Sequence, residues 1–321
     1  MTTHLPQVIH TYQNHALDST RWQHYQPRPD DIIIATSYKS GTTWMQEIVR
    51  QLIFCGQSYR PERDDVALMK ISPWLEQRLL PLDEVLNRVG AQQHRRFLKT
   101  HLALDGLPFF SQVKYIVVGR DARDVAMSMW NHYAGFVDGV FEGMKRRFER
   151  EEDRLPPPPQ DIHAFWRSWI TRGRFAWESE GYPFWGNLHH TQTWWNYRHL
   201  SNILFVHYND LKNDLADEIR RIADYLAIPI AEEALPPILA AVSLEAMRER
   251  EGRLDEMMSN GWKEGAKTFF FKGTNDRWKD ILSAEELALY DEKAAQLLTA
   301  DCRAWLEQGR RALASQPLTA L

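Results

Sequence analysis

The chain has 321 residues, enough to bury a substantial core in one large domain or two small ones. Hydrophobic residues make up 44% and charged residues 26%, as in ordinary globular proteins, and the net charge of −4 argues against nucleic acid as a partner. Neither cysteine, Cys55 or Cys302, belongs to a metal or disulfide pattern, and no stretch resembles a signal peptide or membrane span, so a soluble, cytoplasmic protein is expected.

The first regular elements are a strand and the helix that follows it. Ile32 to Thr36 form a short apolar run, which is typical of a buried parallel strand. From Thr43 onward apolar residues recur at three- and four-residue spacing with polar residues opposite, and this pattern predicts an amphipathic helix. The short loop 37–42 joins the two elements.

Further strands alternate with helices along the chain. The strand candidates are Arg96 to Thr100, Val113 to Gly119 and Ile203 to His207. Asp121 is placed to cap a helix after the second of these, and an apolar pattern from Leu211 to Leu226 predicts one helix after the third. Such alternation predicts an α/β fold in which helices cover both faces of a parallel sheet.

The remaining segments are less regular. Pro156 to Pro159 must form an extended connector, because a helix cannot run through four prolines. A group of tryptophans is expected to pack on helices rather than to contact a ligand: Trp166, Trp169, Trp177, Trp185, Trp194 and Trp195. A second irregular stretch, Gly252 to Arg277, precedes a capping box at Ser283 that opens the last helix.

No linker divides the chain convincingly, so we expect a single domain. It would span 1–321, with a core at 30–283, an N-terminal extension at 1–29 and a C-terminal helix at 284–321 packed on that core.

The loop between the first strand and its helix carries the strongest functional signal. It contains Lys39-Ser40-Gly41-Thr42-Thr43-Trp44. The first N–H groups of a helix lack partners within the helix, and the helix dipole is positive there. Glycine allows close approach of the backbone, while the hydroxyls add donors and Lys39 adds a charge. These features suit a phosphate or sulfate group, the alternative being an ordinary connector.

This loop differs from the standard ATP-binding pattern GxxxxGKS/T, in which lysine directly follows the second glycine. Here Lys39 precedes Gly41 by two positions, and no glycine occurs from Asp30 to Ser40. The difference counts against an ATP-dependent small-molecule kinase that uses magnesium. That kinase and a catalytically inactive nucleotide-binding protein are the two alternatives to the function described next.

Thr36 to Trp44 resemble the phosphosulfate-binding loop of the cytosolic-type sulfotransferases, which use 3′-phosphoadenosine 5′-phosphosulfate (PAPS). The usual family text is TYPKSGTTW, so Lys39 through Trp44 match and Ser37-Tyr38 replace a Tyr-Pro pair. Three more segments match in the expected order: Leu98 to His101 (family LKTH), Val117 to Ser128 (the 3′-phosphate segment) and, loosely, Phe271 to Lys279 (family RKGxxGDWK). The resemblance covers the chain from about Asp30 to Trp278.

The resemblance implies a three-layer sandwich like that of P-loop nucleotide kinases, and in-line sulfuryl transfer from PAPS to a hydroxyl without a metal. Adenosine 3′,5′-bisphosphate (PAP) would be the product. His101 is the expected base, at a strand end where open α/β sheets place their chemistry. Lys39 would stabilise the leaving oxygen, with Lys99 beside it. The implied donor-binding residues are Lys39, Ser40, Gly41, Thr42, Thr43, Trp44, Arg120, Ser128, Tyr208, Phe271, Lys272 and Gly273.

Some of these residues have plainer interpretations. Arg120 could pair with Asp121 or Asp124 at the surface, and Trp44 and Tyr208 could be core residues.

Three positions depart from the family pattern. Phe271 replaces an arginine, Asp276 replaces a glycine, and Leu244 replaces an aromatic residue. Either PAPS binds more weakly or Arg277 compensates. The family's C-terminal dimerisation motif is also poorly matched, so a homodimer is left open.

The acceptor is expected to be a small molecule bound between residues 130–148 and 235–262. Phe136, Val140, Phe141 and Trp262 indicate an apolar acceptor such as a phenol, a sterol-like alcohol or a glycolipid. Loops of this kind vary freely on a fixed scaffold, so this is the least determined part of the prediction.

Overall fold

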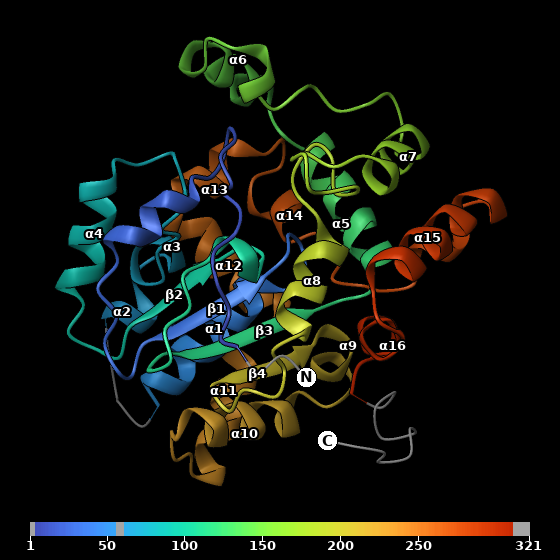
Figure 1. Ribbon diagram of the computed structural model, residues 1–321. Helices are drawn as coiled ribbons and strands as arrows, with labels where there is room; N and C mark the ends of the chain where they lie inside the picture. The colour runs from blue at the N-terminus through green and yellow to red at the C-terminus, as the bar shows by residue number, and fades with distance from the viewer. Residues whose placement is uncertain (1–3, 56–60, 311–321) are drawn as a thin grey trace.

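The computed structural model of the protein describes residues 4–55 and 61–310. Within them a four-stranded parallel sheet has the order β2-β1-β3-β4 (Figure 1). The strands are β1 (Ile32–Thr36), β2 (Phe97–Thr100), β3 (Lys114–Gly119) and β4 (Ile203–His207). All four sequence-predicted strands are confirmed. Because they are parallel, their carboxyl ends share one edge of the sheet.

Successive side chains of β1 enter different cores, as the pleat of a strand requires. Ile32 and Ile34 pack with the helices of one face, and Ile33 and Ala35 with those of the other. The first face is covered by α1 (Thr42–Ile53), α10 (Leu215–Leu226) and α11 (Leu235–Ala241). The second is covered by α5 (Ala122–Ala134), α7 (Ile162–Thr171), α8 (Asn187–Trp195), α15 (Ala284–Leu297) and α16 (Ala300–Gln308). The predicted three-layer α/β sandwich is confirmed.

The other helices are short or lie at the periphery. They are α2 (Pro61–Asp64), α3 (Leu68–Ile71), α4 (Leu82–Ala91), α6 (Asp138–Arg147), α9 (Tyr208–Asn213), α12 (Leu244–Leu254), α13 (Glu256–Gly261) and α14 (Ala266–Phe269). Short 3₁₀ helices are η1 (Ser19–His24), η2 (Leu104–Gly106), η3 (Glu151–Asp153), η4 (Glu232–Ala234) and η5 (Arg277–Asp280). Figure 1 shows α6 standing away from the sheet layers.

Two expected helices are interrupted. The pattern from Leu211 to Leu226 is not one helix: Asp214 ends α9 and caps α10, its carboxylate accepting the Asp217 N–H at 3.0 Å. The helix expected at 284–321 is also wrong as one piece, because α15 ends at Leu297 and α16 begins at Ala300. Residues 311–321 of that prediction lie outside the described residues. The capping box at Ser283 is confirmed.

Of the two segments expected to be irregular, one is confirmed and the other contains helices. Pro156 to Pro159 have no helical structure, as predicted. The stretch from Gly252 to Arg277, expected to be irregular, contains the end of α12 and the short helices α13 and α14. Since these helices have four to eleven residues, their apolar period is too short to be recognised from the sequence.

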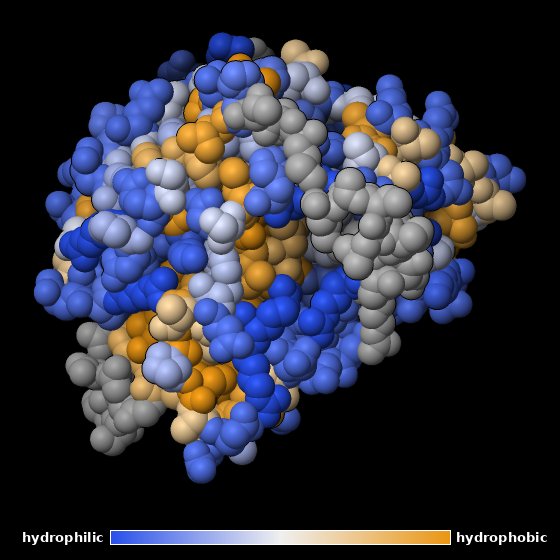
Figure 2. Space-filling model, turned by 60° about the horizontal axis from the view of Figure 1, so that its bottom comes forward, coloured by the Kyte–Doolittle hydropathy of each residue, from blue (hydrophilic) through white to orange (hydrophobic). Residues whose placement is uncertain are grey.

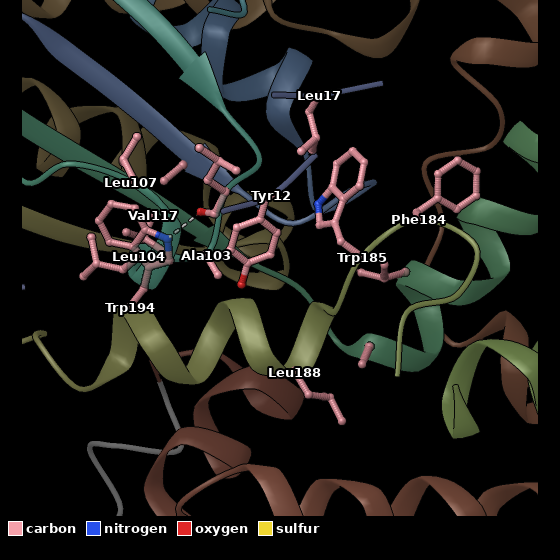
Figure 3. Packing of buried hydrophobic residues seen from close by; sticks show 14 of the residues in the cluster. Tyr12, Leu17, Ala103, Leu104, Leu107, Val117, Phe184, Trp185, Leu188 and Trp194 are labelled. Atoms are coloured by element: carbon pink, nitrogen blue, oxygen red, sulfur yellow. Dashed lines mark hydrogen bonds between the residues drawn. The ribbon is translucent and has the colours of Figure 1, made fainter. Parts of the chain in front are cut away.

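Four of the six tryptophans pack on helices as expected, at positions 166, 169, 194 and 195. Trp194 donates its indole N–H to the Leu102 carbonyl at 3.2 Å and lies close to Leu104 and Leu107 (Figure 3). Trp177 and Trp185 are different, because both lie outside helices. Trp185 is nevertheless buried in the core that includes residues of α5, α7 and α8, and Trp177 packs against the same core, so the packing prediction holds for them as well.

Hydrophilic residues make up most of the face in Figure 2, and hydrophobic residues show between them chiefly near its middle and lower left. Among the described residues no helix combines the length and hydrophobicity needed to cross a bilayer.

Candidate active site

The loop after β1 lies at the carboxyl edge of the sheet and leads directly into α1. Lys39 (φ 60°) and Gly41 (φ 108°) both have left-handed backbone conformations. A Cβ atom at Gly41 would lie 3.0 Å from the ring of Tyr208, so space as well as conformation favours glycine. A turn of this kind at a helix N-terminus presents backbone N–H groups that suit an anion.

Hydroxyl groups hold the loop in shape. Thr36 Oγ1 lies 2.6 Å from Thr42 Oγ1, and Ser37 Oγ lies 2.7 Å from Ser40 Oγ. Asn187, at the start of α8, donates its side-chain N–H to Ser37 Oγ. No sequence motif marks Asn187 as part of this loop. Because Ser40 and Thr42 bond within the protein, the backbone N–H groups are the more available donors to a ligand.

His101 directly follows β2 and is buried. Its Nδ1 lies 2.8 Å from the Thr36 carbonyl oxygen, which can only accept, so Nδ1 carries the proton and Nε2 holds the lone pair. The His101 backbone N–H donates to Glu76 at 2.8 Å, and Thr100 donates to the same carboxylate oxygen. Burial, followed by the charge of Lys99, holds the pKa of His101 well below its ordinary value. The imidazole is therefore neutral near pH 7.

Two buried lysines, Lys99 and Lys39, lie near this histidine, and the charge of Arg120 acts on Lys39. Burial and the charges of Arg120 and Lys99 lower the pKa of Lys39 to about 7. Burial lowers the pKa of Lys99 to about 8, against the opposing charges of Glu76 and Asp255. A buried cluster of cations that repel one another is stabilised when a polyanion binds, because the anion favours their charged forms.

Arg120 links the loop after β1 to the loop at 271–279. Its guanidinium donates to Asn275 Oδ1 at 2.8 Å, to the Thr274 carbonyl at 3.0 Å and to the Lys39 carbonyl at 3.2 Å. The same group lies over the ring of Tyr208, 4.2 Å from its centroid. Two chain segments far apart in sequence thus meet at one arginine.

The aspartates that follow Arg120 have other partners. Asp121 caps α5 through the Arg123 N–H at 2.9 Å and pairs with the Arg123 guanidinium at 2.6 Å. Burial raises the pKa of Asp124 to about 6. In the described part of the chain Arg120 is buried and forms no ion pair with either residue, so the surface-pair interpretation is wrong. Ser128 lies on α5 and is half-buried.

The late loop closes beside Trp44 and Tyr208. Their ring centroids are 5.4 Å apart in an edge-on arrangement. Tyr208 donates its hydroxyl to the Gly273 carbonyl at 3.3 Å, and Lys212 donates to the same oxygen at 2.9 Å. Lys272, next in the chain to Gly273, is therefore brought to the same side as the first loop. Lys212 is a further cation here that no motif indicated.

Two cations lie near the ring of Phe271. Its ring centroid is 5.6 Å from Lys272 Nζ and 5.0 Å from the Arg277 guanidinium carbon. Burial and the positive charge of Arg120 lower the pKa of Arg277, so the two guanidinium groups lie near each other. Arg277, which the sequence suggested as a substitute for the arginine that Phe271 replaces, thus lies in this region.

The other two departures also adjoin this region. Asp276 has a left-handed backbone (φ 66°), the conformation in which glycine is favoured, and it pairs with Lys279 at 2.9 Å. Leu244 Cδ2 would lie 3.4 Å from a Cβ placed on Gly273. The aromatic residue that Leu244 replaces would stand next to the same glycine.

His132, on α5, was not singled out from the sequence. Its Nδ1 lies 3.3 Å from Lys39 Nζ, and its ring centroid is 4.8 Å from that of Trp262 and 5.5 Å from that of Phe269. The only available signal was its position four residues, about one helical turn, after Ser128.

The two segments expected to form the acceptor site do lie together. Phe136 forms a backbone bridge with Trp262, and their ring centroids are 5.2 Å apart. Phe141 lies 6.1 Å from Phe136, and Val140 is half-buried next to it on α6. An aromatic wall therefore stands beside Lys39, on the side of His132.

A second aromatic group surrounds His101. The ring centroids of Tyr38, Trp74 and Trp185 lie 4.6, 4.9 and 5.8 Å from that of His101. Figure 3 shows Trp185 beside Phe184 and Leu17, in the loop that leads into α8. Sequence reasoning missed these residues because they come from three separate loops.

Comparisons with known proteins show the family of the chain. The model of the sulfotransferase domain matches residues 29–300. The glycolipid sulfotransferase of Mycobacterium tuberculosis is 34% identical over 313 residues, 94% of each chain. Human sulfotransferase 1C2 is 27% identical over 275 residues, 84% of this chain and 83% of its own.

Solved structures share the fold at lower identity. Retinol dehydratase in a complex with retinol and PAP has a TM-score of 0.67 at 21% identity, covering 88% of this chain and 87% of its own. Mouse sulfotransferase SULT7A1 complexed with PAP has a TM-score of 0.63 at 19% identity, covering 92% and 93%.

Proposed function

The chain belongs to the sulfotransferase family, and we propose that it transfers a sulfuryl group from PAPS to a hydroxyl of a lipid-like acceptor, with His101 as the base. The observation that carries this proposal is the hydrogen bond from His101 Nδ1–H to the Thr36 carbonyl. It leaves the Nε2 lone pair unprotonated at the sheet edge where the anion-binding loop begins α1. Base and anion site are thus built from neighbouring strand ends.

The residues at this edge suit a nucleotide with two anionic ends. Backbone N–H groups of Gly41, Thr42 and Thr43 would hold the 5′-phosphosulfate, with Lys39 against it. Arg120, Ser128 and the loop carrying Phe271, Lys272 and Gly273 would hold the 3′-phosphate, since a guanidinium binds phosphate through paired hydrogen bonds. The rings of Trp44 and Tyr208 would face the adenine.

The donor supplies an SO₃ group whose bond to the bridging phosphate oxygen breaks as a bond forms to the acceptor oxygen. His101 takes the acceptor's hydroxyl proton at Nε2, and the two products are a sulfate ester and PAP. Lys39 stabilises the negative charge that develops on the leaving oxygen, and Lys99 adds positive charge beside the reacting atoms.

The pKa of the His101 imidazole is low partly because cations lie near it. Burial lowers this pKa most, followed by the charges of Lys99 and Lys39, and a bound polyanion offsets the part that is due to these charges. His101 is therefore a better base with the donor in place than in its absence. This coupling links proton removal to donor binding.

The acceptor would lie between the two aromatic groups. Phe136, Phe141 and Trp262 offer apolar and stacking contacts on one side, and Tyr38 and Trp185 on the other. Such a surface suits a molecule with an extended apolar part and a hydroxyl at its end. A glycolipid fits this description, and the similar protein of Mycobacterium tuberculosis is named a glycolipid sulfotransferase.

The test is sulfate transfer by the purified protein from PAPS to phenols, sterol alcohols and glycolipids, detected by mass spectrometry, together with calorimetric binding of PAP and of ATP with magnesium. We expect PAP to bind without metal and His101→Ala to lose about 10²–10⁴-fold in transfer rate while still binding PAP. His199→Ala, at an exposed histidine, is the control. No binding of PAP, or an unchanged rate in His101→Ala, contradicts the proposal.

A further inference from the structure

Lys39 has an unusual partner. Its Nζ lies 3.3 Å from His132 Nδ1 and 4.8 Å from the centroid of the Phe269 ring. Among the residues that the structure describes, no carboxylate pairs with this ammonium group. An imidazole on α5 is therefore the polar side chain that holds the lysine.

The chemistry of the two groups defines the direction of this hydrogen bond. When Lys39 is protonated its ammonium group can only donate, so in that state His132 Nδ1 accepts and the neutral ring carries its proton on Nε2. Burial, followed by the charges of Lys39, His101 and Lys99, holds the pKa of His132 well below its ordinary value. His132 is thus kept in the neutral form that can accept from Lys39.

The groups facing Lys39 from the surrounding elements are otherwise mostly cationic or neutral. They are Lys99 from β2, Arg120 from the end of β3, and the imidazoles of His101 and His132. The cations favour the uncharged amine, whereas an accepting nitrogen and an aromatic face favour the ammonium ion. His132 and Phe269 therefore oppose the repulsion from Lys99 and Arg120.

The His132 ring is itself held firmly. Trp262 donates its indole N–H to the His132 carbonyl at 3.1 Å, and the ring centroids of Phe136 and Trp262 lie 5.2 and 4.8 Å from that of His132. The same two aromatic residues form the acceptor wall. A side chain packed in this way has few rotamers open to it, so Nδ1 stays directed at Lys39.

We propose that His132 is a positioning residue that keeps the Lys39 side chain protonated and directed at the reacting centre before the donor binds. This inference rests on the proposed role of Lys39 in sulfuryl transfer. It adds a second histidine to the site, one that acts through Lys39 and removes no proton from the acceptor.

The deciding experiment is the pH dependence of kcat/KM for PAPS, which reports groups of the free enzyme. In His132→Phe, whose side chain suits the aromatic surroundings, Lys39 loses its acceptor and deprotonates at lower pH. We expect the alkaline limb of the profile to move down by about one pH unit, so that activity on this limb falls about tenfold. The acid limb should stay in place.

His132→Asn is the rescue variant, because its side-chain oxygen lies as far from Cβ as Nδ1 does and can accept from Lys39. It should return the alkaline limb to within a few tenths of a unit of the wild-type position. His199→Phe, at an exposed histidine, controls for loss of a histidine as such. An unmoved limb in His132→Phe, or a limb equally displaced in His132→Asn, overturns the inference.

A second measurement does not depend on turnover. The rate of Lys39 acylation by a small reagent, followed by mass spectrometry across pH, gives the protonation midpoint of its amine directly. We expect a lower midpoint in His132→Phe than in wild type, and the same midpoint in both would overturn the inference. Absence of PAPS turnover in wild type would contradict the proposed function alone, because this readout remains.

Discussion

We propose that Arg277, together with Arg120, makes up for one departure from the family pattern. Phe271 stands where arginine is usual, and it offers a phosphate no hydrogen bond. The Arg277 guanidinium packs against the Phe271 ring and lies close enough to Arg120 for their charges to interact. Two guanidinium groups in one region suit one phosphate.

Replacing Arg277 with glutamine should weaken PAP binding about tenfold or more, because a charge-assisted hydrogen bond to the 3′-phosphate is lost. Binding of adenosine 5′-phosphate, which has no 3′-phosphate, should change little. Calorimetric titration of both nucleotides measures this difference. Arg220→Gln, at an exposed ion pair on α10, is the matched control. Equal weakening for both nucleotides would contradict a role specific to the 3′-phosphate.

At the scale of elements, the interruption at Asp214 separates two helices with different tasks. α9 carries Tyr208 and Lys212, which bond to the Gly273 carbonyl of the late loop. α10 instead lays its apolar side on the sheet. One continuous helix could not turn both sets of side chains toward their partners, and the aspartate satisfies an N–H group that the break exposes.

Asp214→Ala should therefore lower the free energy of unfolding by about 1 kcal/mol, the usual cost of removing an N-cap. Urea unfolding followed by circular dichroism measures it. Asp224→Ala, an exposed aspartate later in the same helix, should change the free energy by no more than about 0.5 kcal/mol. Equal effects of the two variants would show that Asp214 does not act as a cap.

At the scale of the whole molecule, several histidines are buried in the neutral form. Burial is the first cause that lowers the pKa of His15, His101, His132, His190 and His207. Burial with the charges of Arg174 and Arg78 lowers the pKa of His15 to about 3. Such a group takes up a proton in the unfolded chain at a higher pH than in the folded protein, so its contribution to stability falls as the pH drops below about 6.5.

The variant His15→Phe isolates one of these groups. Between pH 7.5 and pH 5.5 the wild type should lose about 1.4 kcal/mol more of its unfolding free energy than the variant loses, because the unfolded wild-type chain binds one more proton. Urea unfolding at the two pH values measures both losses. His199→Phe should behave like the wild type. An identical loss in wild type and His15→Phe would show that His15 does not stay neutral on folding.

Much of the fold and part of the site followed from the order of residues along the chain. The apolar runs predicted all four strands to within a residue, since strand formation is reflected in neighbouring side chains. The loop from Lys39 to Trp44 and the segment ending at His101 indicated the family in the same way. The helix breaks at Asp214 and after Leu297 were missed, because an apolar period can continue across a break of one or two residues.

The sequence by itself determined the layered α/β fold, the family and the residues of its motifs, because these are local patterns read over a few positions. Only the tertiary structure decided which side chains meet. His132 lies 93 positions from Lys39, and Asn187 lies 150 positions from Ser37, yet each pair is in contact. Contacts of this kind depend on how the elements pack together. No local sequence pattern indicates them, because the two residues are far apart along the chain.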